Sequence, residues 1–116
     1  MSSSANVQKS VIGRRLREAR ERAGLAQDRL GVLAGLEESS SSARMSRYES
    51  GVHEPPFKFA EALANVLGVP VAYLYCSDDR LAEIILTYSN SPEAVRQDLL
   101  TMCRQIQKGG SPPSDN

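Results

Sequence analysis

Residues 24–51, GLAQDRLGVLAGLEESSSSARMSRYESG, limit most tightly how this chain can fold. They contain two short amphipathic stretches, 27–34 and 41–50, separated by a turn that starts at Gly35. Gly35 can adopt the left-handed backbone conformation that ends a helix without steric cost. Gly31 lies one helical turn earlier, where a side chain would hold a second helix away. The segment therefore predicts two short helices in close contact across a tight turn.

The second stretch separates apolar from small polar side chains, as an amphipathic helix does. Met45 and Tyr48, spaced i, i+3, form one face. The opposite face carries short side chains and one cation, namely Ser42, Ala43, Ser46 and Arg47. Two helices joined in this way are typical of a helix-turn-helix, whose second helix enters the major groove of DNA.

Three matching pieces extend the pattern to about half of the chain: IGRRLREARERAGLAQDRLGVLAG, SRYESG and PPFKFAEALANVLGVPVAYLY. With them, residues 12–74 resemble the DNA-binding domain of the Cro and phage-repressor family, the XRE-type regulators. A Gly-Leu-x-Gln opening, a small-x-x-x-Gly turn and a Ser-Arg-x-Glu-x-Gly ending occur in the family's order. The resemblance implies an all-α, five-helix, lambda-repressor-like DNA-binding domain.

The spacing after the turn departs from the family pattern. In the usual motif five residues separate the turn glycine from the apolar residue that matches Met45, whereas here nine do, residues 36–44. Four extra residues are close to one helical turn. Either the recognition helix begins a turn early, in which case Ser40 and Ser41 join the base-reading residues, or the serine run is a longer, mobile turn.

Hydrophobic spacing, caps and helix breakers predict seven helices and no strand, and therefore an all-α protein. We expect a disordered tail over residues 1–10, the helix-turn-helix domain over 11–76, a C-terminal helical element over 77–108 and a second disordered tail over 109–116. Within the C-terminal element, Asp78 or Asp79 caps the first helix. Ser91-Pro92-Glu93 is a strong start signal for the second, with Ser91 as its cap.

The resemblance implies two sets of DNA contacts. Base contacts fall on Ser42, Ala43, Ser46 and Arg47, and an arginine can form two hydrogen bonds with a guanine edge. Gln27, in the first turn of the first short helix, is expected to hold a phosphate, with a simple helix-start residue as the alternative. Further candidates for phosphate contacts are Arg44, which could reach a base instead, and Arg14, Arg15, Lys58 and His53. For His53, a plain loop residue is the favoured interpretation.

Arg20 and Glu49 match a pair that, in several relatives, joins the first helix to the end of the recognition helix. We therefore expect a partly buried ion pair between them, in which losing one partner costs more than losing both. The alternative is two independent surface charges.

The two C-terminal helices carry more apolar surface than a five-helix domain needs. Their stripe consists of Leu81, Ile84, Ile85, Val95, Leu99, Met102 and Ile106. We interpret it as a homodimerisation element, since two-fold dimers of this motif read palindromic sites with half-sites about 34 Å apart. Packing back on the same chain is the rival interpretation. Cys103, on the same stripe, is expected to be a buried small apolar residue.

The chain has 14 basic and 14 acidic side chains and a formal net charge of +0. Residues 1–60 hold ten basic against seven acidic residues, a balance of +3, and the remainder holds four against seven, a balance of −3. This weak polarity places positive charge where phosphates would lie and predicts modest non-specific affinity for DNA. Ordinary solvated helix faces would give a similar balance.

Length and composition narrow the function classes. A chain of 116 residues suits one modest core without a separate catalytic module, and one histidine offers no catalytic constellation. Two isolated cysteines and that histidine do not make a metal site, and no cofactor is implied. Cys76 and Cys103 should stay reduced, a redox disulfide between dimer mates being the less favoured alternative. With no apolar stretch of spanning length and no signal region, we expect a cytoplasmic protein without a membrane partner.

Three functions fit these observations. The first is a homodimeric transcriptional repressor that occupies a palindromic operator in double-stranded DNA. The second is a DNA-binding antitoxin whose C-terminal helices hold a toxin subunit. The third is a protein–protein adaptor that uses the same fold without reading DNA.

Overall fold

The computed structural model describes residues 10–109, which form seven helices and no strand, and the all-α prediction is confirmed. Apart from Ser10 and Gly109, the tails predicted at residues 1–10 and 109–116 lie outside the described residues. The helices are α2 (Val11–Ala23), α3 (Gln27–Leu33), α4 (Glu38–Ser50), α5 (Phe57–Leu67), α6 (Val71–Leu74), α7 (Asp79–Asn90) and α8 (Glu93–Gln107).

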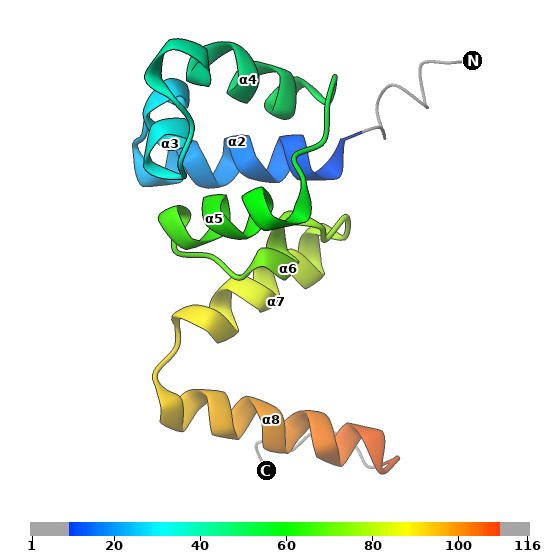
Figure 1. The fold of residues 1–116 in the computed structure, drawn as a ribbon. Coiled ribbons are helices and arrows are strands. Elements are labelled where there is room, and N and C mark those ends of the chain that lie inside the picture. Colours follow the sequence, from blue (N-terminus) through cyan, green and yellow to red (C-terminus); the bar gives the residue numbers. More distant parts are fainter. Residues whose placement is uncertain (1–9, 110–116) are drawn as a thin grey trace, which may run out of the picture.

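Helices α2 to α6 form a compact body, here called the reading head, in which α2 runs between α4 on one side and α5 on the other (Figure 1). Each helix contributes buried apolar side chains to one shared core. The largest that are fully buried come from all five helices: Ile12, Leu16, Leu30, Met45, Leu63, Tyr73 and Leu74. Fully burying a large aliphatic side chain contributes about 1.5–3 kcal/mol, so this core holds the reading head together.

Two glycines allow the helices to approach closely. A Cβ at Gly31 would lie 2.8 Å from Cγ of Met45 and would overlap the hydroxyl of Ser41. A Cβ at Gly13 would lie 2.6 Å from the carbonyl oxygen of Glu49 and 2.7 Å from that of Tyr48. The sequence indicated the first contact, between α3 and α4, but not the second, in which α2 touches the backbone of α4.

The extra residues after Gly35 lengthen the recognition helix. α4 begins at Glu38, three residues before the start expected from the sequence, and the turn is confined to the few residues after Gly35. The added turn packs on α3, because Ser41 is fully buried and its hydroxyl donates a hydrogen bond of 2.7 Å to the carbonyl of Asp28. The mobile-turn alternative is therefore wrong.

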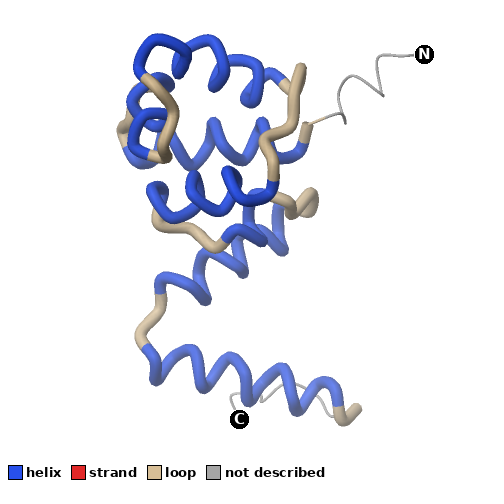
Figure 2. The backbone as a smooth tube through the Cα atoms, viewed as in Figure 1, coloured by secondary structure: helices blue, strands red, loops and turns tan. Residues whose placement is uncertain are grey.

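Helices α7 and α8, here called the C-terminal pair, are attached less tightly. The carboxylate of Asp78 caps α7 by accepting hydrogen bonds from the backbone N–H groups of Arg80 and Leu81, at 2.9 and 3.2 Å. Ala82 is the one buried residue of α7, and α8 has none. Figures 1 and 2 show α8 set apart from the reading head beyond a short loop.

The start of α8 differs from the expectation. Pro92, not Ser91, occupies the N-cap position of α8, and no side chain there accepts a hydrogen bond from the first turn. Ser91 instead closes the end of α7, where its hydroxyl donates a 2.6 Å hydrogen bond to the carbonyl of Thr87. Between residues 10 and 109, no helix combines the length and hydrophobicity needed to cross a bilayer.

Candidate nucleic-acid interface

The outer face of α4 is open to solvent along its length. Met45 is 0% and Tyr48 is 5% exposed, because both pack into the core. Four side chains on the opposite side of the helix are exposed: Ser42, Ala43, Ser46 and Arg47. The structure therefore brings the four residues predicted to read bases onto one accessible helix face.

A shallow hollow of about 250 Å³ lies beside the C-terminal end of this face. Its lining includes Arg44, Arg47, Tyr48 and His53. Arg44 Nη2 donates a 3.0 Å hydrogen bond to the hydroxyl of Tyr48, and the backbone N–H of His53 donates to the carbonyl of Arg47 at 3.2 Å. The guanidinium of Arg47 has no ion pair with any described residue, so its donors remain available to an acceptor outside the chain.

Glu49, on the inner side of α4, is held by three side chains. Arg20 contacts it through two nitrogens, with Nε 2.6 Å from Oε2 and Nη2 3.1 Å from Oε1. Gln27 Nε2 donates to Oε1 at 3.0 Å, and Arg17 Nε lies 3.5 Å from the same oxygen. The side chain of Glu49 is 0% exposed and that of Arg20 is 14% exposed. The pair expected from the sequence is therefore a bidentate, buried contact that joins α2 to α4.

This cluster affects two neighbouring groups. Hydrogen bonding to Glu49 raises the pKa of Arg20 above its ordinary value and keeps the guanidinium charged. Gln27 is positioned at the start of α3 by its bond to Glu49, which engages one of the two hydrogens of its amide nitrogen. A phosphate at this point would have to accept a hydrogen bond from the other hydrogen, or the amide group would have to rotate.

Arg15 is not available as a phosphate contact, contrary to expectation. Its side chain is 4% exposed, and its guanidinium donates to Cys76 O at 2.8 Å, Glu18 Oε1 at 3.0 Å and Asp79 Oδ1 at 3.0 Å. Burial lowers the pKa of Arg15, but the hydrogen bonds to Glu18 and Asp79 outweigh burial, so the pKa is raised. Arg14, the other candidate on α2, also contacts Asp79, at 3.0 Å.

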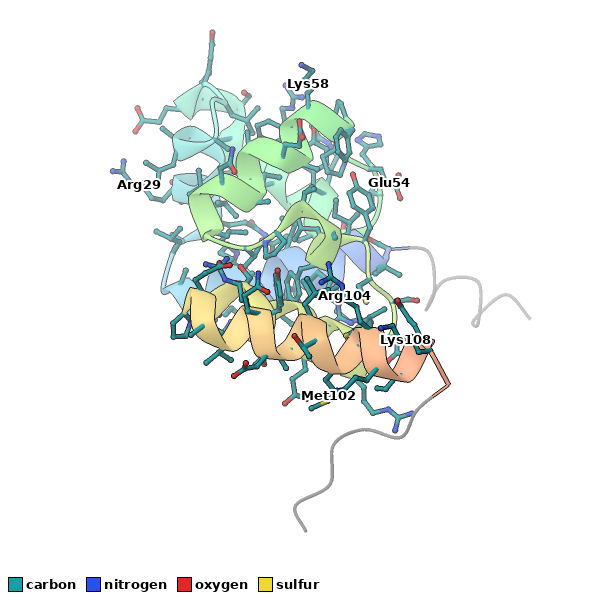
Figure 3. The ribbon with its side chains drawn as sticks, turned by 90° about the horizontal axis from the view of Figure 1, so that it is seen from below. Arg29, Glu54, Lys58, Met102, Arg104 and Lys108 are labelled. Atoms are coloured by element: carbon teal, nitrogen blue, oxygen red, sulfur yellow. The ribbon has the colours of Figure 1, made fainter. Side chains whose placement is uncertain are left out.

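Other exposed cations of α3, α4 and α5 make no ion pair with a described residue. They are Arg29 on α3, Arg44 and Arg47 on α4, and Lys58 at the start of α5. Arg29 and Lys58 extend away from the reading head (Figure 3). Sequence reasoning missed Arg29, although its place two residues after Gln27 in the first turn of α3 was a usable signal. His53 is exposed and lies in the loop after α4.

The early start of α4 does not add both extra serines to the reading face. Ser41 is buried against α3 and cannot reach a base. Ser40 is half-buried, and its hydroxyl lies 3.4 Å from the carbonyl of Glu37. The residues that the longer helix does bring to the surface are Glu38 and Ser39.

The C-terminal pair exposes most of the apolar stripe that the sequence indicated. Among described residues, six large side chains of α7 and α8 are 38–62% exposed: Leu81, Ile84, Tyr88, Val95, Met102 and Ile106. Here they are called the apolar face. Figure 3 shows Met102 on the edge of α8 that points away from α5. A groove of about 460 Å³ runs alongside, lined from α7 by Ile84, Ile85 and Tyr88 and from α8 by Leu99, Leu100 and Cys103.

Three residues of that stripe depart from the expectation. Ile85 is half-buried against the core of the reading head, so the rival interpretation of packing on the same chain holds for this one residue. Leu99 is half-buried in the groove. Cys103 is exposed, not buried, and lines the same groove. Within residues 10–109, no three His, Cys, Asp or Glu side chains gather closely enough to hold a metal ion.

Comparisons with known proteins agree with this geometry. Residues 11–74 match a family model described as a helix-turn-helix domain. The crystal structure of the transcriptional regulator BswR superposes with a TM-score of 0.80 at 44% sequence identity, over 85% of this chain and 98% of that chain. No curated protein sequence matches the chain significantly.

Proposed function

The chain belongs to the helix-turn-helix family as an XRE-like member, and from this premise we propose that it is a sequence-specific, DNA-binding transcriptional regulator. Its matched region, residues 11–74, coincides with the reading head. The similarity to the transcriptional regulator BswR extends beyond that region and supports the same role for the whole chain.

The observation that carries the proposal is the outward face of α4. A helix needs exposed side chains that are short enough to let it enter the major groove, together with a donor long enough to reach a base edge. Ser42, Ala43 and Ser46 meet the first requirement, and the unpaired Arg47 meets the second. Arg29, Arg44 and Lys58 are exposed cations on α3, α4 and α5 and supply positive charge that attracts phosphates.

We further propose that the protein acts as a homodimeric repressor on a palindromic operator. The apolar face is the supporting feature, because α7 and α8 leave six large apolar side chains 38–62% exposed, and extensive exposed apolar surface marks interaction sites. A two-fold pairing through α7 and α8 would leave α4 of each protomer free, because α4 and α8 lie at opposite ends of the molecule (Figure 1). Occupying the operator in this way would block transcription.

Selection of bound sequences from a pool of random double-stranded DNA tests the proposal. We expect a two-fold symmetric site, with an affinity that falls as salt rises because phosphates release counterions. Arg47→Ala should relax the preference at one position of each half-site, at a cost of about 1–3 kcal/mol in discrimination. Arg29→Ala and Gln27→Ala should weaken binding to all sequences alike.

Arg104→Ala is the matched control, because Arg104 is an exposed arginine on α8, at the opposite end of the molecule from α4 (Figure 1). It should bind the selected site as the wild type does. If Arg47→Ala and Gln27→Ala also behave like the wild type, the assignment of roles is wrong. If the wild type shows no salt-dependent affinity for any DNA, the proposed function itself fails and an adaptor role is favoured.

A further inference from the structure

A buried arginine connects the reading head to the C-terminal pair. Arg15 lies on α2, yet two of its three hydrogen-bond partners belong to the segment that leads into α7, the carbonyl of Cys76 and the carboxylate of Asp79. The third partner, Glu18, lies on α2 itself. Arg14 adds a second guanidinium to the same Asp79 oxygen at 3.0 Å.

Apolar packing alone leaves the angle of α7 poorly fixed. The buried contact of α7 with the reading head is made by Ala82, assisted by the half-buried Ile85 and Leu86. An alanine presents a small, smooth surface that has no protruding side chain to resist rotation. α8 adds no buried residue to this contact.

The guanidinium of Arg15 supplies the directional constraint that this contact lacks. Its planar fork forms hydrogen bonds only along fixed directions, unlike the rotatable ammonium of a lysine. The fork is itself held in place, since its centre lies 5.5 Å from the ring centre of Tyr73, whose hydroxyl is 3.3 Å from Glu18. Asp79 is in the first turn of α7, so fixing its carboxylate fixes the start of that helix.

We propose that Arg14, Arg15 and Asp79 form a latch that sets the angle between the reading head and the C-terminal pair, and that this angle determines which half-site spacing the dimer accepts. The second part rests on the proposed function. In a dimer joined through α7 and α8, the relative orientation of the two reading faces depends on this angle in both protomers. Adding one base pair between the half-sites rotates the second half-site by about a tenth of a helical turn. The angle must therefore vary little if the dimer is to accept one spacing.

The first experiment measures the angle in the free protein. Spin labels are attached to cysteines introduced as Ser39→Cys on α4 and Thr101→Cys on α8, both exposed, in a Cys103→Ser background that retains the buried Cys76. Labelled chains are diluted in unlabelled protein, so that only distances within one chain are recorded. We expect one narrow distribution of distances between the two labels. It should broaden or shift in Asp79→Ala, and Asp79→Glu should restore the wild-type distribution.

Glu83→Gln is the matched control, because Glu83 is an exposed carboxylate on the same helix with no ion pair to a described residue. It should leave the distribution unchanged. Thermal unfolding of each variant shows whether it remains folded, which we expect because the side chain of Asp79 is 78% exposed. An Asp79→Ala variant that keeps the wild-type distribution would overturn the latch.

The second experiment uses duplexes in which two selected half-sites are moved apart or together in steps of one base pair. The wild type should prefer one spacing by at least about tenfold. Asp79→Ala should bring all spacings to within about threefold of each other. The affinity for a single half-site and the dimer dissociation constant should stay at their wild-type values, which a merely destabilised protein would not show.

The two experiments separate two kinds of failure. A wild type that is monomeric, or that binds no DNA, would contradict the proposed function, while the distance measurement still decides whether the latch fixes the angle. A wild type that binds every spacing equally, or an Asp79→Ala variant with the wild-type spacing preference, would overturn the link between latch and spacing.

Discussion

At the scale of single residues, the buried carboxylate of Glu49 is the group in the reading head whose charge most needs a compensating partner. It is fully inaccessible, and only the guanidinium of Arg20 faces it at bidentate hydrogen-bond distance. Removing one partner of a buried pair leaves an uncompensated charge and costs about 3–5 kcal/mol, whereas replacing both by apolar residues is often neutral. We therefore expect Arg20→Ala to lower the free energy of unfolding by about 3–5 kcal/mol, measured by urea denaturation.

The double variant Arg20→Met, Glu49→Leu provides the comparison. It should be more stable than Arg20→Ala, because no charge is left buried. Arg17→Ala, which removes the 57% exposed partner at 3.5 Å, should change stability by less than about 1 kcal/mol. If Arg17→Ala and Arg20→Ala had equal effects, the bidentate contact would not be the one that holds α2 to α4.

The two packing glycines also act as single residues, and their neighbours differ. The Cβ of Gly13→Ala would meet backbone carbonyls at 2.6 and 2.7 Å, which can move only if α4 moves. The Cβ of Gly31→Ala would meet the side chains of Met45 and Ser41, which can rotate. Overpacking costs about 1–3 kcal/mol and exceeds the gain of about 0.5–1 kcal/mol from replacing a helical glycine. We expect Gly13→Ala to be the more destabilising in urea denaturation; equal stability of both variants and the wild type would contradict the close approach.

These residues also show what the sequence could and could not reveal. The pattern of residues 24–51 was enough to place Gly31 between two helices and Arg47 on an open face, because both follow from local periodicity. It could not distinguish Arg14 and Arg15 from arginines that face DNA. Asp79, the partner that both arginines share, lies 65 positions beyond Arg14 and 64 beyond Arg15 along the chain. Such a contact is set by tertiary packing, which local patterns do not contain.

At the scale of elements, the length of α4 shows the same limit of what local sequence patterns can predict. The four extra residues fit one helical turn, but a serine-rich segment favours turns as readily as helices. A contact with another helix favours the helical form, namely the hydrogen bond from the buried Ser41 to the carbonyl of Asp28 on α3. The same burial removes Ser41 from the reading face that the longer helix would otherwise extend.

The attachment of α7 should respond to acid. Hydrogen bonds from Arg14 and then Arg15 lower the pKa of Asp79 below its ordinary value of 3.8. A carboxyl whose pKa is lowered by folding contributes stability that is fully present above the unfolded-state pKa and is lost as pH falls through the folded-state pKa. We expect the wild type to be more stable than Asp79→Asn near neutral pH. The difference should shrink as pH falls below about 4, measured by denaturation across a pH series.

An Arg14→Gln background supplies the control for that series. Because the hydrogen bond from Arg14 is the largest cause of the lowered pKa, the loss of stability caused by Asp79→Asn should be smaller in this background at neutral pH. The effect is modest in either background, since the carboxylate is exposed and screened by solvent. A stability difference that grows on acidification would mean that Asp79 is not stabilised as a carboxylate.

At the scale of the whole molecule, the proposed homodimer depends on the C-terminal pair, which contributes a single buried residue to the described structure. The apolar face exposes Ile84, Met102 and Ile106 to solvent, and a two-fold dimer joined through this face would bury these residues in both protomers. Ile106→Asp would place two carboxylates in such an interface at a cost of several kcal/mol, so the dimer dissociation constant should rise by at least about a hundredfold. Sedimentation equilibrium over a range of concentrations measures this change.

Leu33→Asp is the matched control for assembly, because Leu33 on α3 is 46% exposed and Ile106 is 49% exposed. It should leave the dimer intact, since the reading head contributes no part of the apolar face. Ile106→Asp should also bind a palindromic site no more tightly than a single half-site, because linked half-sites raise affinity only when the two reading heads are joined. Dimers of unchanged stability in Ile106→Asp would show that α8 is not the assembly surface, and the half-site spacing would then have to be set elsewhere in the chain.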